Sequence, residues 1–357
     1  MTIIEFAPTT HFELPPGRTA TEPAEHRGLR RDGVRLLVAR PTGITHRRFH
    51  DLTDELSPGD LVVVNTSQTI AAELTGRAEG NWPVVLHVAT PLDDGSWVVE
   101  LRTAPDGAEP ILNARAGDRF SFGDDEAVRV ELHEPYPASY SPTGHGNRLW
   151  RAHVNSELPF ADYLSRNGRP ISYGYLSRHW PLSDYQTVFG QHPGSAEMPS
   201  AARPFTTELV TRLVSSGISV APITLHTGVS SQEAGEGPQP ERFSVPPTTA
   251  RLVNQARATG GRVVAVGTTV TRALESAAND EGILTATAGW AELVLGPARP
   301  VRTVTGLISG WHNPDASHLL LVESVVGAEL AQQAYDAAVA ENYLWHEFGD
   351  SCLLLPA

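Results

Sequence analysis

The sequence of 357 residues is short of several features that mark particular classes of protein. It has a single cysteine, Cys352, which excludes an internal disulfide framework and a cysteine-rich metal site. No stretch approaches the roughly 18 consecutive apolar residues of a membrane-spanning helix, and the N-terminus has no basic start followed by an apolar signal segment. We therefore expect a cytoplasmic protein that does not enter a membrane.

Common nucleotide-binding and hydrolase motifs are also missing. Without a P-loop, a Gly-x-Gly-x-x-Gly or a Gly-x-Ser-x-Gly, nucleotide hydrolysis, Rossmann cofactors and serine hydrolysis have no local support. Positive charge is scarce, since the chain has 27 Lys and Arg residues and 41 Asp and Glu residues. The resulting net charge of −14 opposes non-specific attraction to phosphate backbones. The best candidate for a basic patch is the arginine-rich stretch 27–48, for which a solvated surface is the simpler interpretation.

Hydrophobic residues make up 40% of the chain, and its length suits about two domains. Residues 59–150 contain short, β-branched or alternating segments separated by turn signals, which predicts a small barrel or sandwich. From about residue 200 helical and strand patterns alternate, which predicts an α/β arrangement. Three helices are expected there. One begins at the cap Thr206, the second begins at Pro246-Pro247, and the third covers residues 328–342.

The segment RVVAVGTTVTRALESAA, residues 262–278, changes its hydrophobic period at Gly267. A β-branched run suited to a buried strand precedes the glycine, and an amphipathic helical pattern follows Thr268. One interpretation is structural, with a sharp turn and a threonine cap on the helix. The other is functional, because such a turn aims free N–H groups and the positive end of the helix dipole at a ligand.

Chemically useful side chains cluster at the ends of predicted elements. His226 follows a strand, Gly267-Thr268-Thr269 follows another, and the segments 309–318 and 347–351 carry histidine, tryptophan and carboxylate groups. Such a set is sufficient for acid–base chemistry on an organic ligand. Each member also has a structural alternative, as a satisfied histidine, a turn-stabilising aspartate or a core tryptophan. His312 and His318 are six residues apart with no third ligand nearby, so no metal site is expected.

The segment 262–278 resembles the Arg-Val-Ile-Ala-Val-Gly-Thr-Thr-x-x-Arg-x-Leu-Glu-Ser-Ala block of the S-adenosylmethionine:tRNA ribosyltransferase-isomerase family of queuosine biosynthesis. Further blocks resemble this family in the same order along nearly the whole chain. They lie at residues 35–67, 185–195, 223–228, 318–327 and 343–355.

The resemblance implies a large α/β domain, residues 1–66 and 152–357, interrupted by an inserted all-β barrel domain, residues 67–151. It implies that S-adenosylmethionine is a substrate that donates its ribosyl group, and that no metal takes part. The implied acceptor is the aminomethyl group of a modified deazaguanine in a tRNA anticodon. The implied products are epoxyqueuosine, adenine and methionine.

The matched blocks supply the expected site. A sulfonium acidifies the neighbouring 5′ C–H bonds, so a base can remove a proton and start loss of methionine, while an acid or donor assists the departure of adenine. The candidate proton-transfer residues are His226, His312, Glu241 and Asp350, without an assignment of which is the base. The candidate residues for binding S-adenosylmethionine are Gly267, Thr268, Thr269, Arg272, Trp311 and Gly228.

The sequence also departs from the family inside its motifs. Pro204 replaces an expected histidine, Glu197 and Arg203 introduce charges, and Gln68 and Glu73 stand where arginines are usual. Losing two arginines and adding a negative charge disfavours contact with phosphates. Three hypotheses therefore stay open: the queuosine reaction on tRNA, cleavage of or transfer from S-adenosylmethionine with a small-molecule acceptor, and a non-catalytic nucleoside-binding protein.

Overall fold

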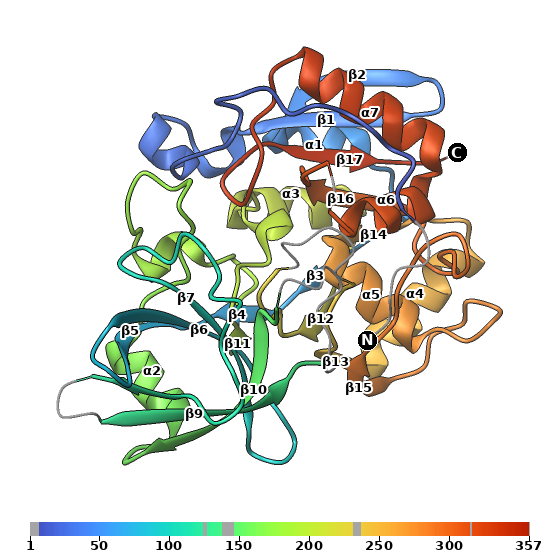
Figure 1. The fold of residues 1–357 in the computed structure, drawn as a ribbon. Helices are drawn as coiled ribbons and strands as arrows, with labels where there is room; N and C mark the ends of the chain where they lie inside the picture. The colour runs from blue at the N-terminus through green and yellow to red at the C-terminus, as the bar shows by residue number, and fades with distance from the viewer. Residues whose placement is uncertain (1–6, 124–126, 138–145, 231–236, 315, 357) are drawn as a thin grey trace.

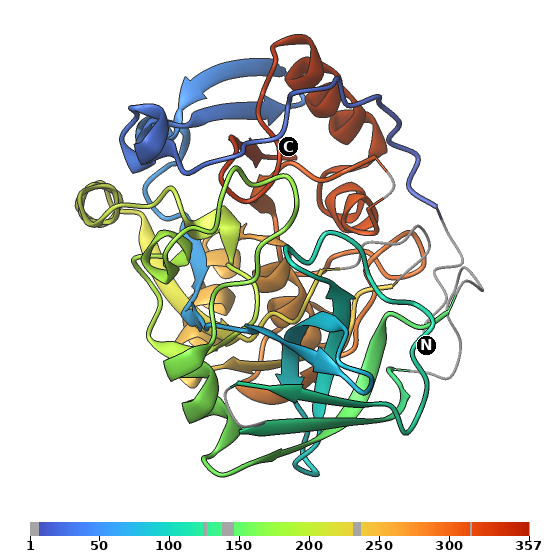
Figure 2. The same cartoon turned by 60° about the vertical axis from the view of Figure 1, so that its left-hand side comes forward.

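The structure is a computed structural model that describes residues 7–123, 127–137, 146–230, 237–314 and 316–356. A large sheet covered by helices lies beside a smaller closed barrel (Figures 1 and 2). The expected fold class, an α/β body with an all-β barrel, is confirmed. The helices are α1 (Leu52–Glu55), α2 (Phe160–Asn167), α3 (Thr207–Ser215), α4 (Pro247–Ala258), α5 (Thr268–Ala277), α6 (His318–Val326) and α7 (Ala328–Ala340).

The large sheet has nine strands, and its centre is parallel. Strands β12, β3, β14 and β16 pair in parallel, whereas the strands toward both edges include antiparallel pairs. In spatial order the strands are β15 (Thr287–Ala291), β13 (Glu241–Val245), β12 (Ser219–Leu225), β3 (Leu61–Asn65), β14 (Val263–Val266), β16 (Gly306–Gly310), β17 (Ser351–Leu354), β1 (Arg35–Arg40) and β2 (Gly43–Arg48).

Both faces of this sheet are buried, which explains the uninterrupted apolar run of β3. Leu61 and Val63 pack with the apolar residues of α4, α5, α6 and α7 on one face. Val62 and Val64 pack with α1 and α3 on the other face. A strand covered on both sides needs apolar side chains at every position, because successive side chains point to opposite faces.

The barrel is closed, with its own core. Its strands are β10 (Leu149–Ser156), β7 (Trp97–Thr103), β6 (Pro83–Pro91), β5 (Glu73–Ala78), β8 (Arg119–Phe122) and β9 (Val128–Pro135), and α2 adds Phe160 and Leu164 to the core. A two-stranded sheet of β4 (Ser67–Thr69) and β11 (His192–Ser195) lies nearby. The domain limits at 66/67 and 151/152 stay a prediction. Since β10 and α2 continue past residue 152 and pack in the barrel core, the structure favours a barrel domain that runs from residue 73 to residue 167.

The helix predictions succeed where the signal is local. The Thr206 hydroxyl accepts a hydrogen bond from the Leu209 N–H at 3.2 Å, as an N-cap of α3 should. α4 begins at Pro247, and α7 buries the face expected for residues 328–342. Among the described residues, none of the helices combines the length and the apolar character that a membrane crossing requires.

The arginine-rich stretch 27–48 has much of its charge compensated within the protein. Arg31 pairs with Glu25 at 2.8 Å, while Arg40 and Arg47 both pair with Glu55, at 2.7 and 2.9 Å. Paired guanidinium groups have less attraction left for phosphate. The solvated-surface interpretation of this stretch fits these contacts.

Candidate active site

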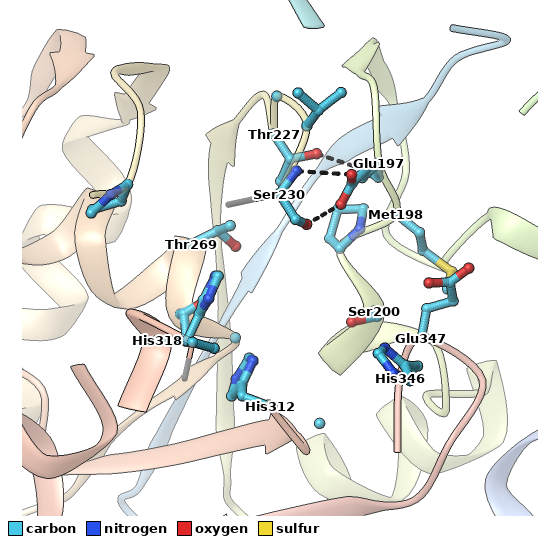
Figure 3. A pocket seen from close by; sticks show the side chains of 18 of the residues that line it. Glu197, Met198, Ser200, Thr227, Ser230, Thr269, His312, His318, His346 and Glu347 are labelled. Carbon is cyan, nitrogen blue, oxygen red and sulfur yellow. Dashed lines mark hydrogen bonds between the residues drawn. The ribbon is translucent and has the colours of Figure 1, made fainter. Parts of the chain in front are cut away.

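A cleft of about 760 Å³ lies between the large sheet and the barrel side of the molecule (Figure 3). The carboxyl ends of the parallel strands β12, β14 and β16 lead into its wall, through residues 227–230, 266–269 and 309–313. Residues 170–175, which follow the barrel, form part of the opposite wall. Ligands of open α/β sheets bind at this end of the strands.

The structure brings eight of the ten expected site residues to this one cleft. These are Glu241, His312, Gly267, Thr268, Thr269, Arg272, Trp311 and Gly228. The other two, His226 and Asp350, lie outside its lining.

The glycine at the strand-to-helix joint holds an unusual backbone conformation. Gly267 has φ +96°, which side-chain-bearing residues rarely adopt, and it is the N-cap of α5. No threonine side chain caps this helix, so the expected threonine cap is absent. The first N–H groups of a helix have no partner within it. At Thr268 and Thr269 they lie in the wall of the cleft, which favours the ligand-facing interpretation.

Arg272 is committed to the protein rather than free for a ligand. Its guanidinium donates to the carbonyls of Gln239, Ala291 and Leu293, at 2.8, 2.6 and 3.3 Å, and to the Glu241 carboxylate. Burial raises the pKa of Glu241, and the arginine opposes that rise. Arg272 therefore acts on the cleft through Glu241, whose position and charge it sets.

Two parallel imidazole rings form another part of the wall (Figure 3). His312 and His318 stack with ring centroids 4.6 Å apart and an interplanar angle of 5°. His312 Nε2 lies 3.0 Å from the Ser309 hydroxyl oxygen. Burial lowers the pKa of His312 well below its usual value, and burial together with Arg272 lowers that of His318 to about 4. Both rings are therefore neutral at neutral pH, and each keeps one unprotonated ring nitrogen.

Trp311 is mainly a core residue, 3% exposed. Its ring packs edge-on against Tyr335 at a centroid distance of 5.0 Å. It also reaches the cleft wall, and its indole N–H has no partner among the described residues. Trp311 is therefore both packed in the core and part of the cleft lining.

His226 and Asp350 have contacts that explain them structurally. His226 Nδ1 lies 2.7 Å from the Ser67 hydroxyl oxygen, and burial lowers its pKa. Asp350 accepts hydrogen bonds from the backbone N–H groups of Arg35 at 2.8 Å and Leu344 at 2.9 Å. These contacts tie Asp350 to the distant start of β1 and to the turn just before it, as the turn-stabilising alternative expects, and its role in proton transfer stays a prediction.

The cleft contains a second acidic region that the sequence analysis did not assign to the site. The Tyr173 hydroxyl donates to Glu197, and the Tyr175 hydroxyl donates to Glu347 at 2.5 Å. Tyr175 also stacks on His346, with centroids 4.3 Å apart. Burial raises the pKa of Glu347 to about 7. This carboxyl therefore exchanges protons near neutral pH.

The sequence singled out two residues of this region but did not predict that they lie in the cleft. Glu197 stands out as an added charge in a family motif, and Glu347 lies in the matched block 343–355. Tyr173 and Tyr175 lie outside the matched blocks in a segment without regular periodicity. Only the placement of residues 170–175 against the strand ends identifies them as part of the cleft.

Glu73 does not add the repulsive surface charge that the sequence suggested. It is fully buried between the barrel and residues 169–172, where its carboxylate contacts His87 Nε2 at 3.0 Å and pairs with Arg169. Burial raises its pKa, but these partners outweigh that effect and hold it below the usual value. A buried, paired carboxylate repels an approaching phosphate little, so this part of the argument against tRNA was wrong.

Comparisons with known proteins agree with the resemblance. The sequence profile of the queuosine biosynthesis protein family matches residues 8–354. A relative from Acidiphilium cryptum, named S-adenosylmethionine:tRNA ribosyltransferase-isomerase, is 34% identical over 96% of this chain and 97% of its own. A relative of the same name from Acaryochloris marina is 35% identical over 91% and 88%.

A solved structure is similar along the whole chain. The crystal structure of S-adenosylmethionine tRNA ribosyltransferase from Thermotoga maritima has a TM-score of 0.52 and 27% identity, and covers 97% of this chain and 99% of its own. Profile, sequence relatives and fold agree over nearly the entire length. This chain belongs to the queuosine biosynthesis protein family.

Proposed function

We propose that this chain is an S-adenosylmethionine-dependent transferase-isomerase. It transfers and rearranges the ribosyl group of S-adenosylmethionine onto the aminomethyl group of a deazaguanine in tRNA, and releases adenine and methionine. Family membership supports this reaction, since the relatives carry its name. The observation that carries the proposal is one cleft at the strand ends that holds neutral imidazoles, buried carboxylates and the start of α5.

The bonds that change define what the site must do. The C5′–S bond breaks with its electron pair going to the methionine sulfur, and the bond from ribose to adenine breaks with its pair going to adenine, which takes up a proton. The pair left on C5′ by loss of its proton forms the new carbon–carbon bond of the rearranged ring, and the ribose ring oxygen leaves one ribosyl carbon and bonds to another to close the epoxide. The acceptor amine forms a bond to a ribosyl carbon and loses a proton. His312, neutral and buried, is the proposed acceptor for the 5′ proton, and Glu241 is the second proposed proton-transfer group.

The cleft also offers donors that suit a nucleoside. The Gln239 side-chain amide nitrogen and the Trp311 indole N–H are buried and have no partner among the described residues. Leaving a buried donor unpaired costs about 1–3 kcal/mol, so these groups suit the ring nitrogens and hydroxyl groups of adenosine. The hydroxyl of Thr269 and the N-terminus of α5 lie in the same wall.

The tRNA acceptor and a cytoplasmic location belong to this proposal. The names of the relatives favour tRNA over a small-molecule acceptor. The buried position of Glu73 removes one objection to tRNA.

Product release tests the proposal. The purified protein is incubated with S-adenosylmethionine, with and without tRNA that carries 7-aminomethyl-7-deazaguanine, and adenine, methionine and the modified nucleoside are measured by mass spectrometry. We expect all three products, and only with the modified tRNA. Release without tRNA would instead indicate a small-molecule acceptor, and no release at all would indicate a nucleoside-binding protein.

Two histidine variants locate the chemistry. His312→Asn should lower kcat by about 100-fold or more, the usual contribution of a proton-transfer group. His226→Asn, outside the cleft lining, should cost much less. Equal losses in the two variants would contradict the assignment of His312.

A further inference from the structure

Two carboxylates in the cleft, Glu197 and Glu347, are held by neighbouring tyrosines. Tyr173 donates to Glu197, Tyr175 donates to Glu347, and the two tyrosine rings stack with centroids 6.0 Å apart. Among the described residues, neither carboxylate forms a salt bridge with an arginine or lysine. Burial raises the pKa of Glu347, and the like charge of Glu197 adds to that rise. They come from different segments, Glu197 shortly before the 3₁₀ turn η6 (Ser200–Ala202) and Glu347 after α7, and Figure 3 shows both at one side of the cleft. Two adjacent carboxylates are unfavourable unless a proton or a cation reduces their repulsion.

Hydrogen bonds orient both carboxylates without neutralising them. Glu197 accepts from the Tyr173 hydroxyl, from the Ser230 N–H at 2.9 Å and from the Ser230 hydroxyl. Glu347 accepts at Oε2 from Tyr175, and its Oε1 has no side-chain donor among the described residues. Neutral donors of this kind hold an anion in place and leave its charge available to a ligand.

An unpartnered tyrosine hydroxyl is the second, independent observation. Tyr185, the last residue of the 3₁₀ turn η5 (Leu182–Tyr185), is 3% exposed and lines the same cleft. Its ring packs against Phe348 at a centroid distance of 5.2 Å, and its hydroxyl has no hydrogen-bond partner among the described residues. Burial and the nearby Glu347 carboxylate raise the pKa of Tyr185. A buried hydroxyl without a partner in the protein keeps a hydrogen bond that a ligand can supply.

We propose that Glu197, Glu347 and Tyr185 form a subsite for a primary ammonium group of a substrate. An ammonium group has three N–H donors, and this side of the cleft offers acceptors from two carboxyl groups and one hydroxyl group. The subsite rests on the proposed function, which supplies two ligands with such a group: the α-ammonium of S-adenosylmethionine and the aminomethyl group of the acceptor base. The imidazoles of His312 and His318 in the same cleft are neutral, so they do not compete as cations.

Matched pairs of probes test the subsite and separate its two sources. The first pair is S-adenosylmethionine and its deaminated 2-oxo analogue. The second pair is an anticodon stem-loop RNA that carries either 7-aminomethyl-7-deazaguanine or the neutral 7-cyano base. Dissociation constants are measured by calorimetry for wild type, Glu197→Gln, Glu347→Gln and Tyr185→Phe. Glu131→Gln, an exposed carboxylate on the barrel, controls for loss of one negative charge.

We expect the two glutamine variants to weaken binding of one ammonium-bearing probe by about 10- to 100-fold, and Tyr185→Phe by about 2- to 10-fold. The neutral partner of that pair should change by less than about twofold, as should every probe with the control variant. The pair that responds identifies the source of the ammonium group. Melting curves followed by circular dichroism verify that the variants fold.

Two results would overturn the subsite. If wild type binds the probes and the three variants alter ammonium-bearing and neutral probes equally, or not at all, the subsite is refuted while the proposed function stands. If wild type binds neither S-adenosylmethionine nor either RNA, the proposed function fails and the subsite fails with it.

Discussion

The pair of Arg272 and Glu241 allows a quantitative prediction. The side chains of Arg272 and Glu241 are 6% and 13% exposed, so removing one leaves the other buried without a counter-charge. Breaking such a pair typically costs about 3–5 kcal/mol. Arg272→Met also strands the buried carbonyls of Gln239 and Ala291, which points to the upper part of that range. We therefore expect about 4–5 kcal/mol for Arg272→Met.

A double-mutant cycle isolates the interaction between the two charges. Arg272→Met, Glu241→Gln and the double variant are unfolded in urea and followed by circular dichroism. Because the double variant leaves no uncompensated charge, the two single effects should exceed the double effect by about 1–3 kcal/mol. Arg242→Met is the matched control, since Arg242 pairs with Asp93 on the surface, with 42% and 69% of the side chains exposed. It should cost less than about 1 kcal/mol.

The outcome that refutes this reasoning is additivity. If Arg272→Met costs no more than Arg242→Met and the cycle closes without a coupling energy, Arg272 does not hold Glu241. It would then be available to a ligand, as the sequence analysis expected.

Three further predictions follow from single contacts. Gly267→Ala forces an alanine to φ +96°, which should cost about 1–3 kcal/mol and weaken binding of S-adenosylmethionine, measured by urea unfolding and calorimetry. The Glu275 carboxylate accepts hydrogen bonds from the backbone N–H groups of residues 302–304, at 2.8 to 3.0 Å. Because Glu275→Gln removes this charge, it should lower the free energy of unfolding by about 1.5–3 kcal/mol. The KM for S-adenosylmethionine should stay unchanged. Burial lowers the pKa of His87, but its two carboxylate neighbours, one of them Glu100, outweigh burial and raise it. The stabilisation by His87 is then complete below pH about 6.5 and is lost as the pH rises through the raised value, so the stability difference between wild type and His87→Gln should shrink at alkaline pH.

Each of these has a contrary result. Unchanged stability of Gly267→Ala would mean that the joint relaxes without cost. A raised KM in Glu275→Gln would place this residue in the ligand site. A stability difference for His87→Gln that grows with pH would mean that the folded protein holds the imidazole neutral.

Sequence-based expectations succeeded where the signal is local or long. The amphipathic pattern of 328–342 predicted α7 and its buried face, because the pattern follows from helix geometry alone. The strands β6 to β9 were expected from alternation and turn residues. By contrast, the pattern alone grouped the apolar segment of β3 with the barrel strands, and only the family resemblance assigned it to the α/β domain, in whose large sheet it lies. A short apolar strand carries no information about which partner strands it joins.

The sequence predicted the positions of some site residues better than their contacts. His312 reaches the cleft because it follows the carboxyl end of β16, a position that the sequence reveals, whereas Glu241, the first residue of β13, was expected from the family resemblance. Arg272 was expected to bind a ligand, but its guanidinium is occupied by Glu241 and by three carbonyls. Asp350 was expected to transfer protons, but it holds two backbone N–H groups. The chemical type of a polar residue limits the partners that it can bind, and its neighbours in the folded structure determine which partner it binds.

The sequence by itself determined the family, the α/β and all-β character of the two parts, and the strand-to-helix turn at Gly267, because periodicity, turn chemistry and long motifs depend on residues adjacent in the chain. The tertiary structure alone decided that Glu197, Glu347 and Tyr185 line one cleft and that Glu73 is buried and paired. Those contacts join residues far apart in the chain. Their electrostatics depend on burial and on distance, and neither quantity exists until the chain has folded.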